Sequence, residues 1–167
     1  MSYFMVADAH PSRGARSAGI LLYRRTGKAL EVLLVHPGGP IWARRDAGAW
    51  SIPKGEYQDE EEPLAAARRE FAEELGSPAP PGETIDLGEV RQRSGKRVRA
   101  WGLAGDLEAD RIRSNTFTMQ WPARSGRPRE FPEVDRAQWF APEQAREKIN
   151  PAQSELLGRL IEELEHR

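Results

Sequence analysis

Three glutamates, Glu70, Glu73 and Glu74, are the side chains of this chain whose type and spacing could do chemistry together. The residues around them, 63–75, have the pattern of a helix, because a proline suits the first turn, alanines fill the interior, and Gly76 follows where helices often end. At about 100° per residue, Glu73 and Glu74 project about 60° to one side and about 40° to the other side of Glu70. The three carboxylates therefore share one narrow arc of the predicted helix.

An apolar arc lies beside these acids and is expected to fix the helix on a core; it consists of Leu64, Ala67, Phe71 and Leu75. Clustered carboxylates on a rigid element offer the oxygen ligands that Mg²⁺ prefers. The alternative is a solvated acidic face, partly neutralised by Arg69 four residues before Glu73. Residues 55–75 contain eight acidic residues against two basic ones, so this segment needs a counter-charge under either interpretation.

The spacing of this acidic segment resembles the signature of the Nudix hydrolases. Gly55 is followed after five residues by Glu61 and, after seven more, by the run Arg69-Glu70-Phe71-Ala72-Glu73-Glu74-Leu75-Gly76. Every glycine, arginine and glutamate position of the signature is filled between residues 55 and 76. Ser77, where the family usually carries a bulky apolar residue, is the one departure. A pattern with this many positions is far more specific than a lone glycine-rich loop.

The resemblance implies a fold and a chemistry. The fold is of the α+β class, a Nudix-type α/β/α sandwich with a mixed β-sheet between helices. The chemistry is hydrolysis of a nucleoside diphosphate linked to another group, with Mg²⁺ as the cofactor and Mn²⁺ as a substitute. Divalent cations neutralise a phosphoanhydride that would otherwise repel an attacking hydroxide.

The resemblance also assigns roles to single residues. Glu73 and Glu74 would be metal ligands, and Glu70 a ligand or the base that activates water. Arg69 would orient Glu70, and Glu61 would support the metal shell.

Two positions outside the helix complete the implied metal site. The main-chain carbonyl of Lys54 would add an oxygen ligand, while its ammonium could contact phosphate. Glu133 stands where many Nudix proteins carry a loop glutamate that reaches the metals, so it competes with Glu70 for the role of base. A solvated loop acid is the alternative for Glu133, and a solvated turn residue is the alternative for Lys54.

Two further side chains could contact a nucleotide. His36 and Trp42 flank the turn at residues 37–40, where a hydrogen bond and ring stacking, respectively, would serve this purpose. A histidine at a strand end is more often structural. A basic run at residues 91–99 could grip phosphates, or could be a solvated turn.

A length of 167 residues is typical of one domain, which we expect over residues 17–167. Residues 1–16, which precede the first predicted strand, are expected to form an N-terminal arm or a short edge segment laid on the domain. We expect strands at 17–24, 30–36, 50–53, 85–91, 98–103 and 117–121, and helices at 63–75, 142–149 and 151–166.

Composition excludes several classes of protein. There are 25 basic and 26 acidic residues, so the chain lacks the overall positive field of sequence-independent nucleic-acid binders, and a nucleic-acid partner is not expected. The absence of cysteine excludes disulfides, thiolate zinc sites and iron–sulfur clusters, and is compatible with a cytoplasmic location. No apolar stretch is long enough for a membrane helix. A homodimer is compatible with the sequence.

The sequence thus predicts an Mg²⁺-dependent pyrophosphohydrolase. Its expected substrate is a dinucleoside polyphosphate or a nucleoside triphosphate, oxidised ones included. The alternatives are a regulatory Nudix module that binds a nucleotide without cleaving it, and a pyrophosphohydrolase of RNA 5′ ends.

Overall fold

A computed structural model describes residues 15–167, so most of the predicted N-terminal arm lies outside the described residues. At the centre is a mixed sheet whose strands run in the order β4 (Thr84–Arg91), β5 (Arg97–Ala104), β1 (Arg16–Thr26), β2 (Ala29–Pro37) and β8 (Val134–Phe140). Strands β1 and β5 are parallel, and the other neighbours are antiparallel. The short strand β3 (Lys54–Glu56) pairs with the beginning of β1.

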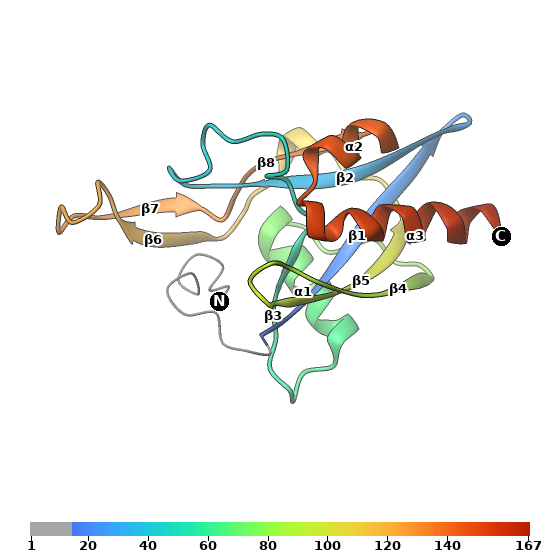
Figure 1. Ribbon diagram of the computed structural model, residues 1–167, viewed down its shortest axis with the longest axis horizontal. Coiled ribbons are helices and arrows are strands. Elements are labelled where there is room, and N and C mark those ends of the chain that lie inside the picture. Colours follow the sequence, from blue (N-terminus) through green and yellow to red (C-terminus); the bar gives the residue numbers. More distant parts are fainter. Residues whose placement is uncertain (1–14) are drawn as a thin grey trace.

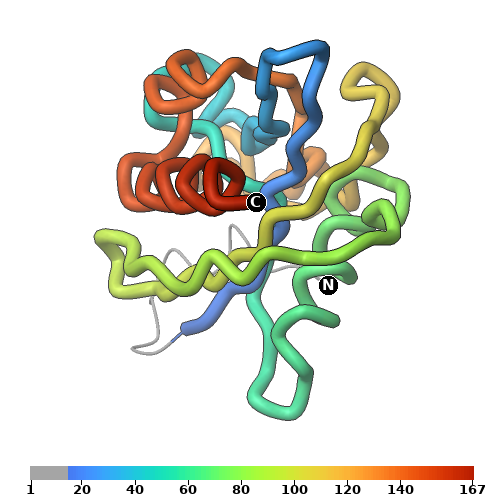
Figure 2. Tube along the Cα trace, turned by 90° about the vertical axis from the view of Figure 1, so that its right-hand side faces the viewer, coloured from blue at the N-terminus to red at the C-terminus, as the bar shows by residue number. Residues whose placement is uncertain are grey.

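Helices cover both faces of this sheet. Helix α1 (Pro63–Leu75) lies on one side, and α2 (Pro142–Lys148) and α3 (Ser154–Glu165) lie on the other, as Figures 1 and 2 show. Side chains of β1 alternate between the two cores: Leu21 packs towards α3, and Ile20 and Leu22 pack towards α1. The predicted α/β/α sandwich is confirmed.

The helix that carries the three glutamates has the predicted bounds. Its N-cap is Glu62, whose carboxylate accepts hydrogen bonds from the backbone N–H groups of Leu64 and Ala65 at 3.2 and 2.9 Å. Gly76 ends it in the left-handed conformation, with φ 77°. The predicted helix at 151–166 is instead a single 3₁₀ turn (Pro151–Gln153) followed by α3.

The strand expected at 50–53 is the main correction. Ser51 exchanges two backbone hydrogen bonds with Val35 of β2, at 2.8 and 2.9 Å. Two residues later the carbonyl of Pro53 accepts from the N–H of Ile20 of β1, at 3.1 Å. The segment crosses from one strand to the other, so it pairs with neither for long, and the strand proper begins at Lys54.

Strand β8 and strand β7 (Pro128–Pro132) are two strands that the sequence did not predict. Strand β6 (Thr116–Gln120), by contrast, matches the expected strand at 117–121. Strand β6 pairs with β7 alone, and this β6–β7 hairpin extends away from the sandwich (Figure 1). Among the described helices none is long and apolar enough to cross a bilayer.

Candidate active site

Helix α1 carries two of its glutamates into the protein. Because Ala67 and Phe71 anchor the helix on β1, the adjacent arc turns towards β3, and Glu70 and Glu74 are only 1% and 3% exposed. Glu133, which directly precedes β8, is 2% exposed. Buried carboxylates are rare in proteins unless they are paired or hold a cation.

Gly55 of β3 makes room for Glu70. A Cβ atom on residue 55 would lie 2.0 Å from the carboxyl carbon of Glu70, a distance that no two such atoms can adopt. Gly55 is not among the described glycines with a positive φ. What Gly55 provides is therefore space for a carboxylate against the backbone, and not a left-handed turn.

Arg69 holds the acids of α1 together. Its Nε and Nη2 donate to the two carboxylate oxygens of Glu61 at 2.8 and 2.9 Å, and its Nη1 donates to Glu70 Oε1 at 2.8 Å and Glu73 Oε1 at 3.3 Å. The two-fold contact with Glu61 fixes the plane of the guanidinium group. Arg69 therefore lies where it can orient Glu70, and Glu61 reaches the cluster through Arg69.

The pKa values of Glu70 and Glu74 are raised because these acids are buried near other carboxylates. Burial and the charge of Glu73 raise the pKa of Glu70. Burial raises the pKa of Glu74 well above its ordinary value, and the charges of Glu70 and Glu133 add to this effect, while Lys54 opposes it.

Lys54 lies beside Glu74. Its backbone N–H donates to Glu74 Oε1 at 3.3 Å. Its side chain is also buried, and burial lowers the pKa of the ammonium group to about 8, an effect to which the charge of Lys96 adds.

The donor set fits a hard divalent cation. Glu70 Oε2 and Glu73 Oε2 are buried oxygens that accept no hydrogen bond, and carboxylate oxygens are the ligands that such cations prefer. Within residues 15–167, however, no three acidic or histidine side chains converge in a complete metal-binding arrangement. Glu61, Glu70 and Glu73 contact Arg69 instead, and Glu74 accepts from the N–H of Lys54.

Asn115 links Glu133 to α1. Its N–H donates to the carbonyl of Glu73 at 2.9 Å, and its carbonyl accepts from the N–H of Glu133 at 2.8 Å. On the other side, the N–H of Gly38 donates to the carbonyl of Glu133 at 2.9 Å, and a Cβ on Gly38 would lie 1.9 Å from the carbonyl oxygen of Pro132. No pattern in the sequence points to Asn115, because it acts through its backbone.

His36 has a structural environment. Its ring is fully buried, with Nδ1 2.9 Å from Asp135 Oδ1 and Nε2 2.6 Å from the carbonyl oxygen of Arg45. Both ring nitrogens are thus engaged within the protein, which leaves none for a nucleotide. The predicted contact between His36 and substrate does not fit this geometry, and the histidine instead ties β8 to the loop before Trp50.

Trp42 and the basic run lie outside helix α1. Trp42 is half-buried, with the guanidinium of Arg45 5.3 Å from its ring centre. The run at 91–99 forms the turn between β4 and β5, as a solvated turn would, but Lys96 pairs with Glu56 of β3 at 3.1 Å. This pairing places one positive charge of the run beside the signature.

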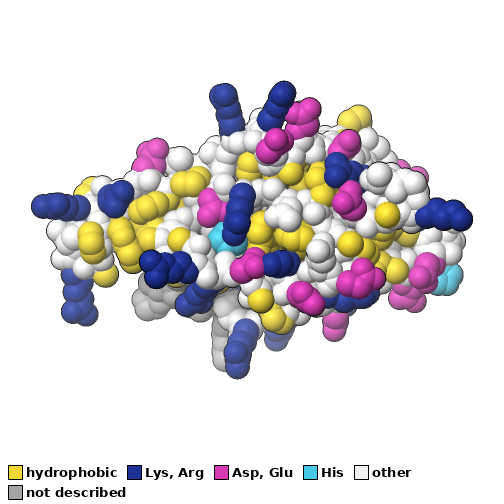
Figure 3. Space-filling model, turned by 90° about the horizontal axis from the view of Figure 1, so that it is seen from above, with side chains coloured by type: hydrophobic (Ala, Val, Ile, Leu, Met, Phe, Trp, Pro, Cys, Tyr) yellow, Lys and Arg dark blue, Asp and Glu magenta, His cyan; other side chains and the backbone are white. Residues whose placement is uncertain are grey.

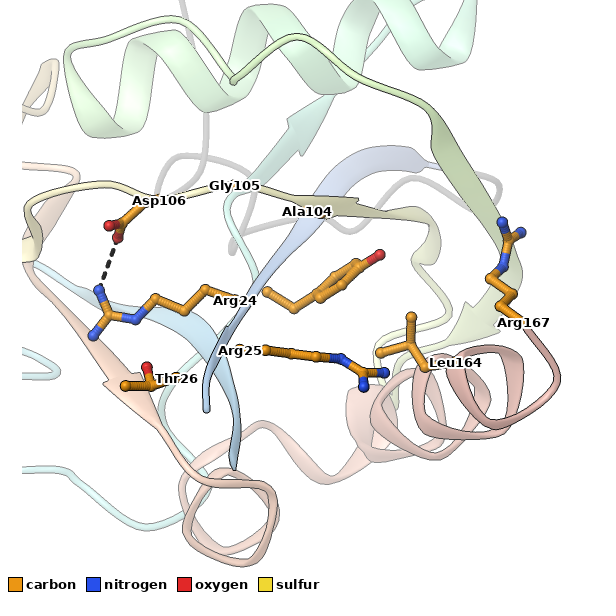
Figure 4. Close-up of a pocket in the computed structure, with 9 residues that line it drawn as sticks. Arg24, Arg25, Thr26, Ala104, Gly105, Asp106, Leu164 and Arg167 are labelled. Carbon is orange, nitrogen blue, oxygen red and sulfur yellow. Dashed lines mark hydrogen bonds and ion pairs between the residues drawn. The ribbon is translucent and has the colours of Figure 1, made fainter. Parts of the chain in front are cut away.

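One small cavity lies at the site and a larger one lies away from it. One of about 10 Å³, lined in part by Lys54, Glu74 and Val134, is too small for more than a water molecule. Another of about 750 Å³ lies at the far end of β1, lined in part by Tyr23, Arg25, Leu164 and Arg167 (Figure 4). It contains no acid of the signature, so we do not assign the reaction to it.

Comparisons with known proteins agree with this geometry. The sequence matches the NUDIX domain family over residues 14–160. The chain belongs to the Nudix family. Membership supports a hydrolase, as the sequence predicted, and Nudix hydrolases generally use divalent metals.

Similar proteins include an RNA pyrophosphohydrolase of Bartonella henselae, 38% identical over 65 residues, which are 36% of this chain and 35% of that protein. The match thus spans about a third of the relative's length. Among solved structures, an Ap4A hydrolase of C. elegans in a binary complex has a TM-score of 0.63 at 20% identity, covering 92% of this chain and 99% of that one. The NUDIX domain of Shewanella oneidensis NrtR, complexed with ADP ribose, has a TM-score of 0.61 at 16% identity, covering 90% and 88%. These structures are alike in fold.

Proposed function

We propose that this Nudix protein is a divalent-metal-dependent pyrophosphohydrolase that cleaves a phosphoanhydride bond in a nucleoside diphosphate-linked substrate. The observation that carries this proposal is that the carboxylates of Glu70, Glu74 and Glu133 are all buried and that the charges of Glu70 and Glu133 act on Glu74. Burying several acids together destabilises a protein unless they serve a cation. A regulatory module that only bound nucleotides would not need them.

Glu70, Glu73, Glu74 and Glu133 would hold the cation, preferably Mg²⁺, together with the carbonyl of Lys54. When bound, such a cation neutralises the phosphate oxygens and aligns the attacking water. If Glu70 is the base rather than a ligand, Arg69 keeps its Oε1 engaged, and Oε2 would take a proton from water. Glu133 is the second candidate for this base. The Lys54 ammonium would offer a positive charge to the substrate phosphates.

A dinucleoside polyphosphate or a nucleoside triphosphate, normal or oxidised, is the substrate class we place ahead of nucleotide sugars. The likeness in fold to an Ap4A hydrolase supports this order. A second candidate, the 5′ end of an RNA, is favoured by the sequence match to an RNA pyrophosphohydrolase.

Product analysis with and without Mg²⁺ tests the proposal. The panel contains dinucleoside polyphosphates, normal and oxidised triphosphates, ADP-ribose and 5′-triphosphorylated RNA. We expect one class to be cleaved only with metal, and Glu73→Gln and Glu74→Gln to abolish cleavage. Glu60→Gln, an exposed acid before the helix, is the matched control and should retain activity. Nucleotide binding without any cleavage would instead establish the regulatory module.

A further inference from the structure

The β6–β7 hairpin has two chemically different faces. Because side chains alternate along a strand, Phe117 and Met119 lie on the same face as their cross-strand partners Phe131 and Arg129. Thr118 lies on the opposite face with Glu130, the one acid of residues 116–132.

The apolar face continues beyond the paired strands. The N–H of Trp121 donates to the carbonyl of Arg127 at 3.1 Å, which places these two residues opposite each other one step further along. One face thus presents a row of apolar side chains on β6 opposite a phenylalanine and two arginines on β7: Phe117, Met119, Trp121, Phe131, Arg129 and Arg127. We call this set the aromatic–arginine face.

This face is exposed at its arginines and partly exposed at most of its apolar side chains. Residues 122–130 are all exposed, Met119, Trp121 and Phe131 are half-buried, and Phe117 at the base is buried. The guanidinium of Arg129 lies 5.7 Å from the ring centre of Phe131. Seen from above in Figure 3, hydrophobic and basic side chains lie beside each other on the hairpin.

The hairpin grows directly out of the candidate site. Strand β6 follows Asn115, which bonds to Glu73 and Glu133, and β7 ends one residue before Glu133. At its base, the Phe117 ring lies against the loop at Gly39, where a Cβ would be 2.8 Å from it. A substrate with its reactive end at the carboxylates can therefore extend along the hairpin.

We propose that the aromatic–arginine face binds the single-stranded polynucleotide that follows a 5′ polyphosphate. Rings on which bases can stack, beside arginines that meet phosphates, are what proteins use to bind single-stranded nucleic acids. With Arg124 in the turn, the hairpin carries three arginines against Glu130 on its other face, so its charge is complementary to a polyanion. Because the whole chain has a net charge of -1, its composition does not indicate this local excess of positive charge. The placement of the 5′ polyphosphate at the carboxylates rests on the proposed function.

Binding is measured first without metal, by fluorescence anisotropy of a short single-stranded RNA with a 5′-hydroxyl end and of the same sequence in DNA. The variant combines Arg124→Gln, Arg127→Gln and Arg129→Gln. We expect it to weaken RNA binding about tenfold and to reduce the slope of log K against log salt by about two, since each phosphate contact on a single strand contributes about 0.7. Comparable binding of the DNA fits the same stacking chemistry.

The matched control removes three positive charges at the opposite end of the sandwich: Arg25→Gln, Lys28→Gln and Arg167→Gln. It should bind RNA with the salt slope of the unaltered protein. Trp121→Ala tests stacking without a change of charge and should also weaken binding about tenfold. Equal affinity and slope for the arginine variant and the control would refute the proposal. So would duplex RNA bound as tightly as the single strand, or sedimentation showing that this face joins two copies of the chain.

Cleavage supplies an independent readout. With Mg²⁺, the ratio of kcat/KM for 5′-triphosphorylated RNA to kcat/KM for ATP should fall about tenfold in the arginine variant and stay constant in the control. If neither substrate is cleaved although RNA binds as described, the proposed function fails and the hairpin proposal stands. If both are cleaved with an unchanged ratio, the hairpin proposal fails and the proposed function stands.

Discussion

The carboxylate of Glu70 lies directly against the backbone of Gly55, and a methyl group on residue 55 would occupy the place of its carboxyl carbon. This contact explains why the signature begins with a glycine on a neighbouring strand. Helix and strand pack closely enough to bury the carboxylate, and the missing side chain is the space that it fills. The remaining freedom of Glu70 is removed by its hydrogen bond with Arg69 at 2.8 Å.

Gly55→Ala should displace Glu70 and so reduce both activity and stability. Overpacking of this kind costs about 1–3 kcal/mol of unfolding free energy, and we expect kcat to fall at least about tenfold, since misplaced catalytic groups lose this much or more. Urea unfolding and steady-state kinetics measure the two effects. Gly158→Ala in α3 is the control, because a Cβ there meets nothing within 4 Å. It should stabilise the protein by about 0.5–1 kcal/mol. Full activity of Gly55→Ala would contradict the role given to this contact.

Local signals were sufficient to predict α1. Its proline, alanines and terminal glycine act within a few residues, so the bounds agree with the structure. Strand β8 has no such signal, because only Val134 and Phe140 of its seven residues are buried, and it is held by pairing with β2, about a hundred residues earlier. Long-range pairing of an edge strand with so few buried residues cannot be deduced from its own sequence.

The candidate site was predictable in its acids but not in its supports. The helical spacing gives Glu70, Glu73 and Glu74 one arc, yet it cannot show that Arg69 also binds Glu61 across the loop. The sequence likewise predicts Glu133 only through the family resemblance. Its link to α1 passes through the backbone of Asn115, which any residue type could supply.

Glu61→Gln should show two separate effects of the ion pair between Arg69 and Glu61. One is on the pH dependence of stability, and the other is on the positioning of Glu70. Hydrogen bonds from Arg69 hold the pKa of the Glu61 carboxyl below its ordinary value. A carboxyl with a lowered folded pKa stabilises the protein above the unfolded value of about 4.3, and this stability is lost as pH falls through the folded pKa. The difference in urea midpoint between wild type and Glu61→Gln should therefore be largest at neutral pH and shrink towards about pH 3.

The same variant should lower kcat more than it raises KM, because Arg69 would then hold Glu70 less firmly. A purely structural contact would change the urea midpoint and leave kcat intact. A midpoint difference that grows as the pH falls would show that Arg69 does not stabilise the ionised form of Glu61.

Glu74→Gln should abolish turnover while raising the stability of the metal-free protein. Burial and the charges of Glu70 and Glu133 disfavour an ionised Glu74, whereas an amide carries no charge and keeps the oxygen that accepts from the N–H of Lys54. Thermal unfolding should show a higher Tm for this variant in EDTA and a smaller rise of Tm on addition of Mg²⁺. A lower Tm in EDTA would mean that Glu74 serves the fold rather than a cation.

Trp42→Ala tests whether the loop after β2 contacts the nucleotide base. The half-buried ring has Arg45 near it, and stacking on a base would contribute to substrate binding equally in the ground and transition states. We therefore expect KM for a nucleoside triphosphate to rise about tenfold with kcat nearly unchanged, because uniform binding is lost. Trp42→Phe should recover most of the affinity, since it keeps an aromatic face. If Trp42→Ala leaves KM unchanged, the ring belongs to the support of the loop, as His36 does, and the base is held elsewhere.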